Sequence, residues 1–305
     1  MLATLPLHDL QYRLKHQGIC LQIGPFIVRI RSHVRSVVDG IQTLYADYPF
    51  EKDADFSDFH VRIASPRNIR RVLRPQVDFF FDGHKPFKPL PLMQAFPFFE
   101  WGVNWCIAGH AHQYVIIHAA TIEKGGYAVI MPGEPGAGKS TLCAALVNRG
   151  WRLLSDELTL VPVETTEVVP VPRPVSLKNE SIEIIREFEP KAVIGHATHD
   201  TAKGTVAHMK APKDSIERSQ EPAKPAWIIF PTYAAGENGQ LVPESKGHAF
   251  MRVIKNAFNY STLGVAGFNT VADLVDACDC YNYRYSNLDD AVADIERLAL
   301  ASTDR

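Results

Sequence analysis

The sequence predicts a mixed α/β fold, and three patterns in it support this prediction. Short apolar runs such as FIVRI and YAVIMP have the length and composition of half-buried or buried strands. Other segments repeat apolar residues at intervals of three and four, as one face of a helix does. In the middle of the chain, a glycine-rich segment follows a strand pattern and precedes a helix pattern. We therefore expect an α+β arrangement in which helices pack on mixed sheets.

The first third of the chain predicts short strands and one helix. The strand patterns are ICLQI, FIVRI, FHVRIA and VDFFF, and the helical pattern covers residues 34–48. No group of residues there resembles a reaction centre. With 305 residues and 46% hydrophobic content, the chain is long enough for two domains. We expect a strand-rich N-terminal domain over residues 1–95, of undefined role, and a second domain over residues 96–305.

Residues 91–112 predict a helix with an aromatic stripe. Its Trp101 and Trp105 could stack on a base, although such a stripe is more often part of a core. The segments YVIIHAATI and YAVIMPG follow as two strands joined by a diglycine turn, which leads into the glycine-rich segment. A helix over residues 139–148 then ends at Gly150.

The remainder of the chain predicts further strands, helices and one long loop. The strand patterns are WRLLSDE, LTLVPV, VVPVP and PAWIIFPTY, and the helical patterns cover residues 248–259, 270–277 and 287–301. Residues 189–225 are polar and loop-like. A stretch of this length inside a compact domain is usually a lid or a mobile functional loop.

The composition argues against several classes of protein. The 32 Lys and Arg against 34 Asp and Glu create no net field for nucleic acid or an anionic membrane. The five cysteines are scattered, and Cys278 and Cys280 are too close in sequence for a usual zinc pair. The N-terminus lacks signal-peptide features, and no stretch reaches 18 apolar residues. We expect a cytoplasmic protein with no membrane or nucleic-acid partner, compatible with a homo-oligomer.

The glycine-rich segment GEPGAGKS matches the pattern of a phosphate-binding loop. The pattern requires Gly, four residues, then Gly, Lys and Ser or Thr, between a strand and a helix. Glycines let backbone amides turn toward the phosphates, Lys139 would reach the β and γ phosphates, and Ser140 would ligate Mg²⁺. We therefore predict binding of ATP with Mg²⁺ by the phosphate loop, defined as Gly133, Glu134, Pro135, Gly136, Ala137, Gly138, Lys139, Ser140 and Thr141.

An acidic pair and a histidine flank the phosphate loop in sequence. Asp156 and Glu157 follow the apolar run WRLL, at a strand end where such a fold presents carboxylates to a nucleotide. One of them could hold Mg²⁺ while the other takes a proton from an attacking hydroxyl. His118, at the end of YVIIH, would come out near the loop and could share a proton with Asp156.

Three basic residues lie in segments after the acidic pair. Arg173 and Lys178 belong to RPVSLKN, and Lys203 belongs to DTAKGTVAH. A cation from these segments could neutralise the transferring phosphoryl group or bind substrate, and a solvated surface charge is an equal alternative. Asn256 and Asn259 could bind an acceptor, but a capping or turn role is more frequent for asparagine.

The order of these features resembles a known family. A strand ending in His118, a hairpin, GEPGAGKST and a helix ending at RGWRLLSDE together resemble the HPr kinase/phosphorylase family over about residues 114–160. A closer resemblance, over nearly the whole chain, is to the HPr kinase-related kinase A group, whose substrate is unassigned. The segments PFFEWGVNWCIAGHAH, RPVSLKN, DTAKGTVAH and NAFNYSTLG contribute to it.

The resemblance implies a P-loop kinase core of the HPr kinase/PEP carboxykinase-like type over residues 96–305. It implies that His118 and Asp156 form an acid/base pair, and that Ser140 and Glu157 face the metal. The acceptor implied is a hydroxyl of a peptide or small protein. The chain departs from the parent family at Glu157, where the family has a second aspartate, and at Thr141, where it has a glutamate. It also lacks the family's downstream signature, so phosphorylase activity and HPr itself are not implied.

The expected function is that of an ATP-dependent kinase acting on a Ser or Thr hydroxyl of a peptide or small protein. In this interpretation Asp156, His118 and Lys139 are catalytic, and the sequence leaves open whether Asp156 or Glu157 is the base. Two alternatives use the same loop. One is an ATP-gated binding or scaffold protein in a peptide-modification pathway, and the other is a kinase for a small metabolite.

Overall fold

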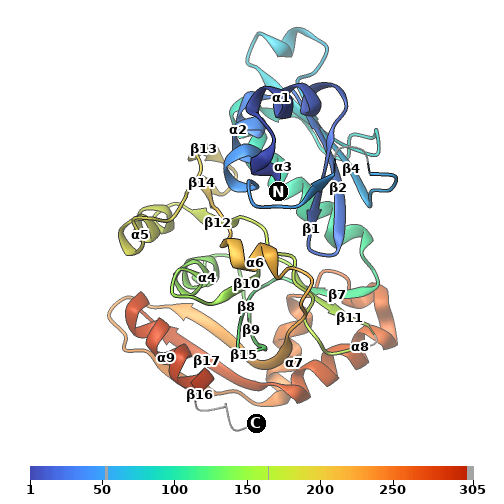
Figure 1. Cartoon of the computed structure of the whole chain (residues 1–305). Coiled ribbons are helices and arrows are strands. Elements are labelled where there is room, and N and C mark those ends of the chain that lie inside the picture. Colours follow the sequence, from blue (N-terminus) through green and yellow to red (C-terminus); the bar gives the residue numbers. More distant parts are fainter. Residues whose placement is uncertain (52–53, 164, 301–305) are drawn as a thin grey trace.

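The computed structural model confirms a mixed α/β fold and describes residues 1–51, 54–163 and 165–300. The N-terminal region, in blue, forms one end of the molecule, and a second sheet with its helices forms the other (Figure 1). A smaller sheet and helix α5 (Ser181–Phe188) lie at one side between these two ends. The N-terminal region begins with the 3₁₀ turn η1 (Leu2–Thr4).

The N-terminal region is built on a six-stranded sheet of order β3-β1-β2-β4-β5-β6. Neighbours β2 and β4 are parallel, and the other pairs are antiparallel. The strands are β1 (Ile19–Ile23), β2 (Phe26–Ser32), β3 (Phe50–Glu51), β4 (Phe59–Ala64), β5 (Gln76–Phe81) and β6 (Leu90–Pro91). The helices are α1 (Leu7–His16), α2 (Arg35–Leu44), η2 (Ile69–Arg71), η3 (Leu92–Gln94) and α3 (Ala95–His110).

Helix α3 belongs by its packing to this N-terminal sheet, and its glycine explains how. A side chain at Gly102 would meet the ring of Phe79 on β5 at 1.9 Å, so only glycine permits this close approach. The buried aromatic residues of α3 fill the same core as β4, β5 and α2. The division at residues 95 and 96 remains a prediction, and the helix that follows it packs on the N-terminal sheet.

The second region is built on a six-stranded sheet of order β10-β8-β9-β15-β17-β16. Its centre is parallel, because β15 pairs in parallel with both β9 and β17. The strands are β8 (Ala119–Lys124), β9 (Tyr127–Pro132), β10 (Arg152–Ser155), β15 (Lys224–Tyr233), β16 (Gln240–Pro243) and β17 (Asp279–Tyr285). The helices around it are α4 (Lys139–Val147), α7 (Lys246–Lys255), α8 (Tyr260–Ala277) and α9 (Leu288–Leu300).

Two smaller sheets complete the fold. The first pairs β7 (Tyr114–Ile117) with β11 (Thr159–Pro162). The second has the order β12-β14-β13 and lies beside α5 in Figure 1. Its strands are β12 (Val175–Lys178), β13 (Thr198–Thr201) and β14 (Gly204–Met209), and helix α6 (Lys213–Glu217) follows them.

The predicted strand YVIIHAATI is wrong in one respect, because it breaks at His118. The part before the break, β7, pairs with β11, and the part after it, β8, pairs with β9 and β10. Apolar residues continue through the break because both strands are buried, so periodicity does not reveal it. The histidine therefore lies where the chain passes from one sheet to another.

The predicted loop-like, structureless stretch over residues 189–225 is also wrong, since β13, β14 and α6 lie within it. The hairpin of β13 and β14 has polar residues because β13 is at the sheet edge and faces solvent. Helices α1 and α5 have no counterpart among the predicted elements. In the described part of the chain, no helix combines the length and hydropathy required to cross a bilayer.

Candidate functional site

The phosphate loop joins β9 to α4, as the sequence predicts, and two neighbouring strands fix its position. The carboxyl ends of parallel strands β9, β15 and β17 meet at one edge of the sheet, which is where ligands bind in open α/β sheets. At that edge the Tyr233 amide donates to the Ala137 carbonyl at 3.2 Å. The Tyr285 hydroxyl donates to the Gly138 carbonyl at 3.0 Å.

Gly138 is the residue of the loop that admits no side chain. Its φ is +91°, in the left-handed region that strains other residues, and it caps the N-terminus of α4. A Cβ there would lie 2.5 Å from the Tyr285 hydroxyl oxygen. Gly136 has a similar φ of +90° but open space around its Cα. The backbone conformation alone therefore favours glycine at position 136, while at position 138 both the conformation and the contact with Tyr285 favour it.

Lys139 folds back over the loop. Its ammonium is buried and donates to the carbonyls of Gly133 and Glu134, at 3.0 Å for the second. Burial lowers the pKa of Lys139, and the nearby Asp156 carboxylate opposes this effect. An anion in the loop would give the ammonium a charged partner in place of these neutral carbonyls.

A cavity of about 1060 Å³ opens in front of the loop. Beside Pro135, Gly136, Gly138 and Thr141 of the phosphate loop, the sequence-predicted residues that line it are His118, Lys139, Ser140, Asp156, Glu157, Lys178 and Lys203. They come from β7–β8, α4, the end of β10, β12 and the β13–β14 turn. We call this space the loop cavity.

Asp156 is the buried carboxylate of the loop cavity. Its Oδ2 accepts a hydrogen bond from the Ser176 amide at 2.9 Å, and its Oδ1 is buried with no partner of normal hydrogen-bond geometry. Burial and the neighbouring Glu157 charge raise the pKa of Asp156 to about 6. Lys178, the Ser176 amide and the Ser140 hydroxyl partly offset this rise. Asp156 is therefore ionised at neutral pH but holds a proton more readily than an ordinary aspartate.

Glu157 has the opposite electrostatic environment. Burial would raise its pKa, but Lys178, Lys203 and other cations outweigh it and lower the pKa of Glu157. The Asn104 amide donates to Glu157 Oε2, and the Lys178 ammonium lies 3.6 Å from Oε1. Two adjacent carboxylates whose pKa values are pushed apart are suited to different roles.

A buried polar chain leads from the N-terminal region to Glu157. The Tyr45 hydroxyl donates to Glu100 at 2.8 Å, and Glu100 forms an ion pair with Arg173. Arg173 also donates to Asn104, which in turn donates to Glu157. Arg173 is thus engaged inside this chain and does not line the loop cavity, in contrast to Lys178 and Lys203.

A second cavity of about 390 Å³ adjoins the loop cavity. Asp156, Glu157, Ser176, Lys178 and Lys203 line both, so the two spaces meet at the acidic pair. Helix α3 and the segments beside it supply an apolar wall to this second space. This apolar wall includes Leu90, Pro97, Phe98, Trp101, Pro174 and Val206. We call it the α3 cavity.

His118 lines the loop cavity as a neutral imidazole at neutral pH. Burial and the nearby Lys139 lower the pKa of His118 to about 4. The ring lies against Phe258 at 5.7 Å between centroids, and the backbone amide donates to the Asn256 carbonyl. Within the described residues no hydrogen bond joins His118 to Asp156.

The residues present fit a divalent cation held partly by phosphates. No group of three His, Cys, Asp or Glu side chains suited to a metal occurs among the described residues. Mg²⁺ is commonly bound through one or two carboxylates or hydroxyls together with substrate phosphates and water. The Glu157 carboxylate and the Ser140 hydroxyl are oxygen donors of this kind in the loop cavity.

No protein-family model and no curated protein matches the chain. Among solved structures, it is similar to the Hpr(Ser) kinase/phosphatase from Coxiella burnetii, with a TM-score of 0.29 and 14% identity. The match covers 61% of this chain and 99% of that one. A likeness of this strength does not indicate an activity.

Several residues of the site have no place among the sequence predictions. Glu100 and Asn104 lie four positions apart on an otherwise apolar helix, and that spacing was the available signal. Ser176 acts through its backbone amide and Tyr285 through its side-chain hydroxyl, and no sequence pattern reveals either contact. Asn259 holds β7 through Ile116 and Tyr114, which is a structural role.

Proposed function

We propose that this protein is an ATP-dependent kinase that transfers the γ-phosphate to a Ser or Thr hydroxyl of a peptide or small protein. The observation that supports it best is the position of Asp156. This carboxylate lines both the loop cavity and the α3 cavity, and its free Oδ1 and raised pKa suit a general base. If ATP occupies one cavity and the acceptor the other, a proton acceptor at their junction can reach the reacting hydroxyl.

In this proposal the loop cavity holds ATP. The backbone amides of the phosphate loop and the start of α4 contact the phosphates, and Lys139 leaves its carbonyl partners for the β and γ phosphates. Ser140 and Glu157 would hold Mg²⁺ together with the phosphates. The bound ion would neutralise phosphate charge. Asp156 has an oxygen without a hydrogen-bond partner, so in this proposal it receives the proton, and Glu157 is the carboxylate that would face the metal.

The transfer step uses residues at the junction. Asp156 Oδ1 takes the proton of the acceptor hydroxyl, and the hydroxyl oxygen forms a bond to the γ-phosphorus. The bond from that phosphorus to the β–γ bridging oxygen breaks, and ADP leaves. Lys178 and Lys203, which line both cavities, stabilise the charge on the transferring group. The neutral His118 would contact the phosphates of ATP without electrostatic repulsion of Lys139.

The α3 cavity supports an acceptor with an apolar group beside its hydroxyl. Phe98, Trp101 and Val206 provide an apolar surface, which would take up a side chain next to the modified Ser or Thr. Its volume of about 390 Å³ also suits a small molecule, which favours a metabolite kinase as the second candidate.

The proposal is tested by following label from γ-labelled ATP with Mg²⁺ into a library of Ser- and Thr-containing peptides and into a small-metabolite extract. We expect label in peptides, and more in those with an apolar residue beside the hydroxyl. Asp156→Asn should bind ATP normally and lose transfer by about 10²–10⁴-fold. Asp214→Asn, an exposed carboxylate on α6, is the matched control and should keep the normal rate.

The pH dependence gives a second measurement. Because the ionised form of Asp156 is the base, kcat/KM should rise as pH passes about 6. Label found only in the metabolite fraction would favour the second candidate. ATP binding without label in any acceptor would reject both and favour an ATP-gated binding protein.

A further inference from the structure

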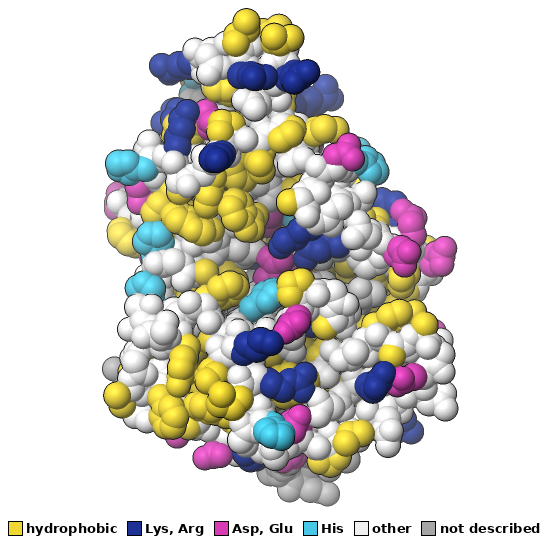
Figure 2. Space-filling view, turned by 180° about the vertical axis from the view of Figure 1, so that it is seen from behind, with side chains coloured by type: hydrophobic (Ala, Val, Ile, Leu, Met, Phe, Trp, Pro, Cys, Tyr) yellow, Lys and Arg dark blue, Asp and Glu magenta, His cyan; other side chains and the backbone are white. Residues whose placement is uncertain are grey.

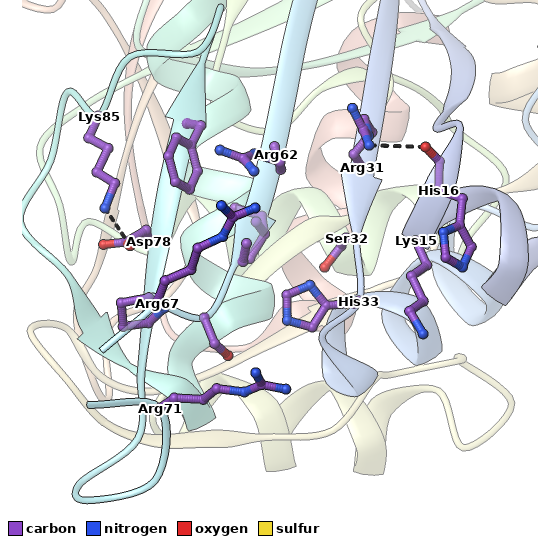
Figure 3. Close-up of a pocket in the computed structure, with 15 residues that line it drawn as sticks. Lys15, His16, Arg31, Ser32, His33, Arg62, Arg67, Arg71, Asp78 and Lys85 are labelled. Carbon is purple, nitrogen blue, oxygen red and sulfur yellow. Dashed lines mark hydrogen bonds and ion pairs between the residues drawn. The ribbon is translucent and has the colours of Figure 1, made fainter. Parts of the chain in front are cut away.

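The N-terminal region contains a pocket of about 700 Å³ at the ends of its two parallel strands. Strands β2 and β4 run side by side with Ser32 opposite Ile63, so the residues that follow each strand lie together. His33 follows β2, and the segment containing Arg67 follows β4 (Figure 3). The crevice beyond the carboxyl ends of parallel strands is a recurrent ligand position in α/β folds.

Basic side chains from four elements and their connections converge on this pocket. They are Lys15 and His16 from the end of α1, Arg31 and His33 from β2 and its end, Arg62 and Arg67 from β4 and its loop, Arg71 from η2, and Lys85. Figure 3 shows Arg67 and Arg71 extending over the opening from the loop side, toward His33 and Arg62. We call this site the basic pocket.

Five of these cations have no carboxylate partner among the described residues. Among the described residues, no ion pair involves Lys15, Arg31, Arg62, Arg67 or Arg71. Arg31 donates to the His16 carbonyl at 3.0 Å, and Arg62 lies 3.7 Å from the centroid of the Phe80 ring. In the described part of the chain, Asp78 is the one carboxylate that lines the pocket, and its Oδ2 is 2.7 Å from Lys85.

Asp78 adds a second, independent sign of a ligand. It is 2% exposed, and its Oδ1 has no hydrogen-bond partner. A buried carboxylate oxygen without a donor is costly, so a ligand that brings a hydroxyl or other donor would satisfy it. Asp78 Oδ1 can therefore accept a hydrogen bond from a bound ligand, while the arginines around it can bind the oxyanion groups of that ligand.

The crowding of like charges affects the groups themselves. Burial lowers the pKa of His33, and Arg71, Lys15 and Arg62 lower it further. Burial likewise lowers the pKa of Arg62, together with Arg31 and Arg67, and only Asp78 opposes this. The pocket therefore holds uncompensated positive charge inside a hollow, where fields are less screened than on an open surface.

We infer that the basic pocket binds a small anion with two or more phosphate or carboxylate groups and at least one hydrogen-bond donor. Arginine forks match the oxygens of phosphate and carboxylate in pairs, and several arginines here can engage one ligand together. The volume is that of a small-molecule site rather than of an extended surface. Figure 2 shows Lys and Arg gathered at this end of the molecule, with charges of both signs on the rest of that face. The inference uses no residue of the loop cavity and is independent of the proposed kinase activity.

The test follows the ring resonances of His33 by NMR while tripolyphosphate, and separately citrate, is added at physiological ionic strength. We expect a saturable shift with at least one of them, and the better ligand identifies phosphate or carboxylate as the group recognised. Because His33 reports locally, binding of tripolyphosphate in the loop cavity does not produce this signal.

The matched variants are Arg71→Gln and Arg70→Gln. These neighbours are both exposed arginines on η2, and only Arg71 lines the pocket. Arg71→Gln should weaken binding by about tenfold or more, as the loss of a charged hydrogen bond does, and Arg70→Gln by less than about twofold. Equal effects of the two variants, no saturable shift with either anion, or binding of a short DNA duplex alone would overturn the inference.

Discussion

The loop cavity and the basic pocket arrange charge in opposite ways. The loop cavity combines both signs, with Lys139, Lys178 and Lys203 facing Asp156 and Glu157. The basic pocket gathers one sign, and its single carboxylate is already paired with a lysine. Mixed charges push neighbouring pKa values apart, as for the two carboxylates of the acidic pair, and this creates a proton acceptor. Uniform charge creates a binding field but no such acceptor.

The two sites are therefore suited to different work. In the two proposals, the loop cavity performs a reaction and the basic pocket binds a ligand. The buried chain from Tyr45 through Glu100, Arg173 and Asn104 to Glu157 ties the two regions together. Helix α3, which carries two members of this chain, packs on the N-terminal sheet and also forms a wall of the α3 cavity.

The largest effect is expected where that chain is broken. Arg173→Ala leaves Glu100 as a buried charge without its partner, and should lower the free energy of unfolding by about 3–5 kcal/mol. Denaturant unfolding measures this. Arg186→Ala, which removes an exposed pair with Glu183, should cost less than about 1 kcal/mol. Equal losses for the two variants would show that the buried chain does not join the regions.

The next effect concerns the loop glycines. Ala at Gly136 or Gly138 adopts an unfavourable left-handed conformation, at a cost of about 1–2 kcal/mol. Gly138→Ala also meets the Tyr285 hydroxyl, and such overpacking costs about 1–3 kcal/mol more. Calorimetry with ATP and Mg²⁺ should show weaker binding for Gly138→Ala than for Gly136→Ala. If the two bind ATP equally, the contact with Tyr285 does not shape the loop.

A smaller effect tests the acidic pair through stability. The pKa of Asp156 is raised from 3.8 to about 6 in the folded protein, so folding disfavours its ionised form. The contribution of protonated Asp156 to the free energy of unfolding is fully present below about pH 4, and it is lost as pH rises through about 6. Asp156→Asn should therefore be more stable than the wild type at pH 7 by about 1–3 kcal/mol. This gain should vanish at pH 4, and a gain independent of pH would contradict the assignment.

The sequence predicted the position of the glycine-rich loop between a strand and a helix, because local geometry sets that arrangement. Gly138 and Lys139 need only a strand before them and a helix after them. The mixed fold and most helices of the second region also follow from periodicity. The break at His118 and the engagement of Arg173 depend on distant partners, β11 and Glu100, which no local pattern encodes. The basic pocket could not be predicted from the sequence, because its cations are spread along the chain from Lys15 to Lys85.

The smallest effect probes the uniform charge of the basic pocket without any ligand. Arg71 is the foremost charged neighbour that lowers the pKa of His33, so Arg71→Gln should raise the His33 pKa toward its ordinary value. Arg70→Gln should leave it unchanged, since Arg70 does not line the pocket. An NMR titration of the His33 ring measures both. Added salt should shrink the difference, because screening weakens a field that no carboxylate compensates. If Arg71→Gln leaves the His33 pKa unchanged, the Arg71 guanidinium does not act on the pocket. The basic pocket would then not differ from the loop cavity in how its charges act on its own residues.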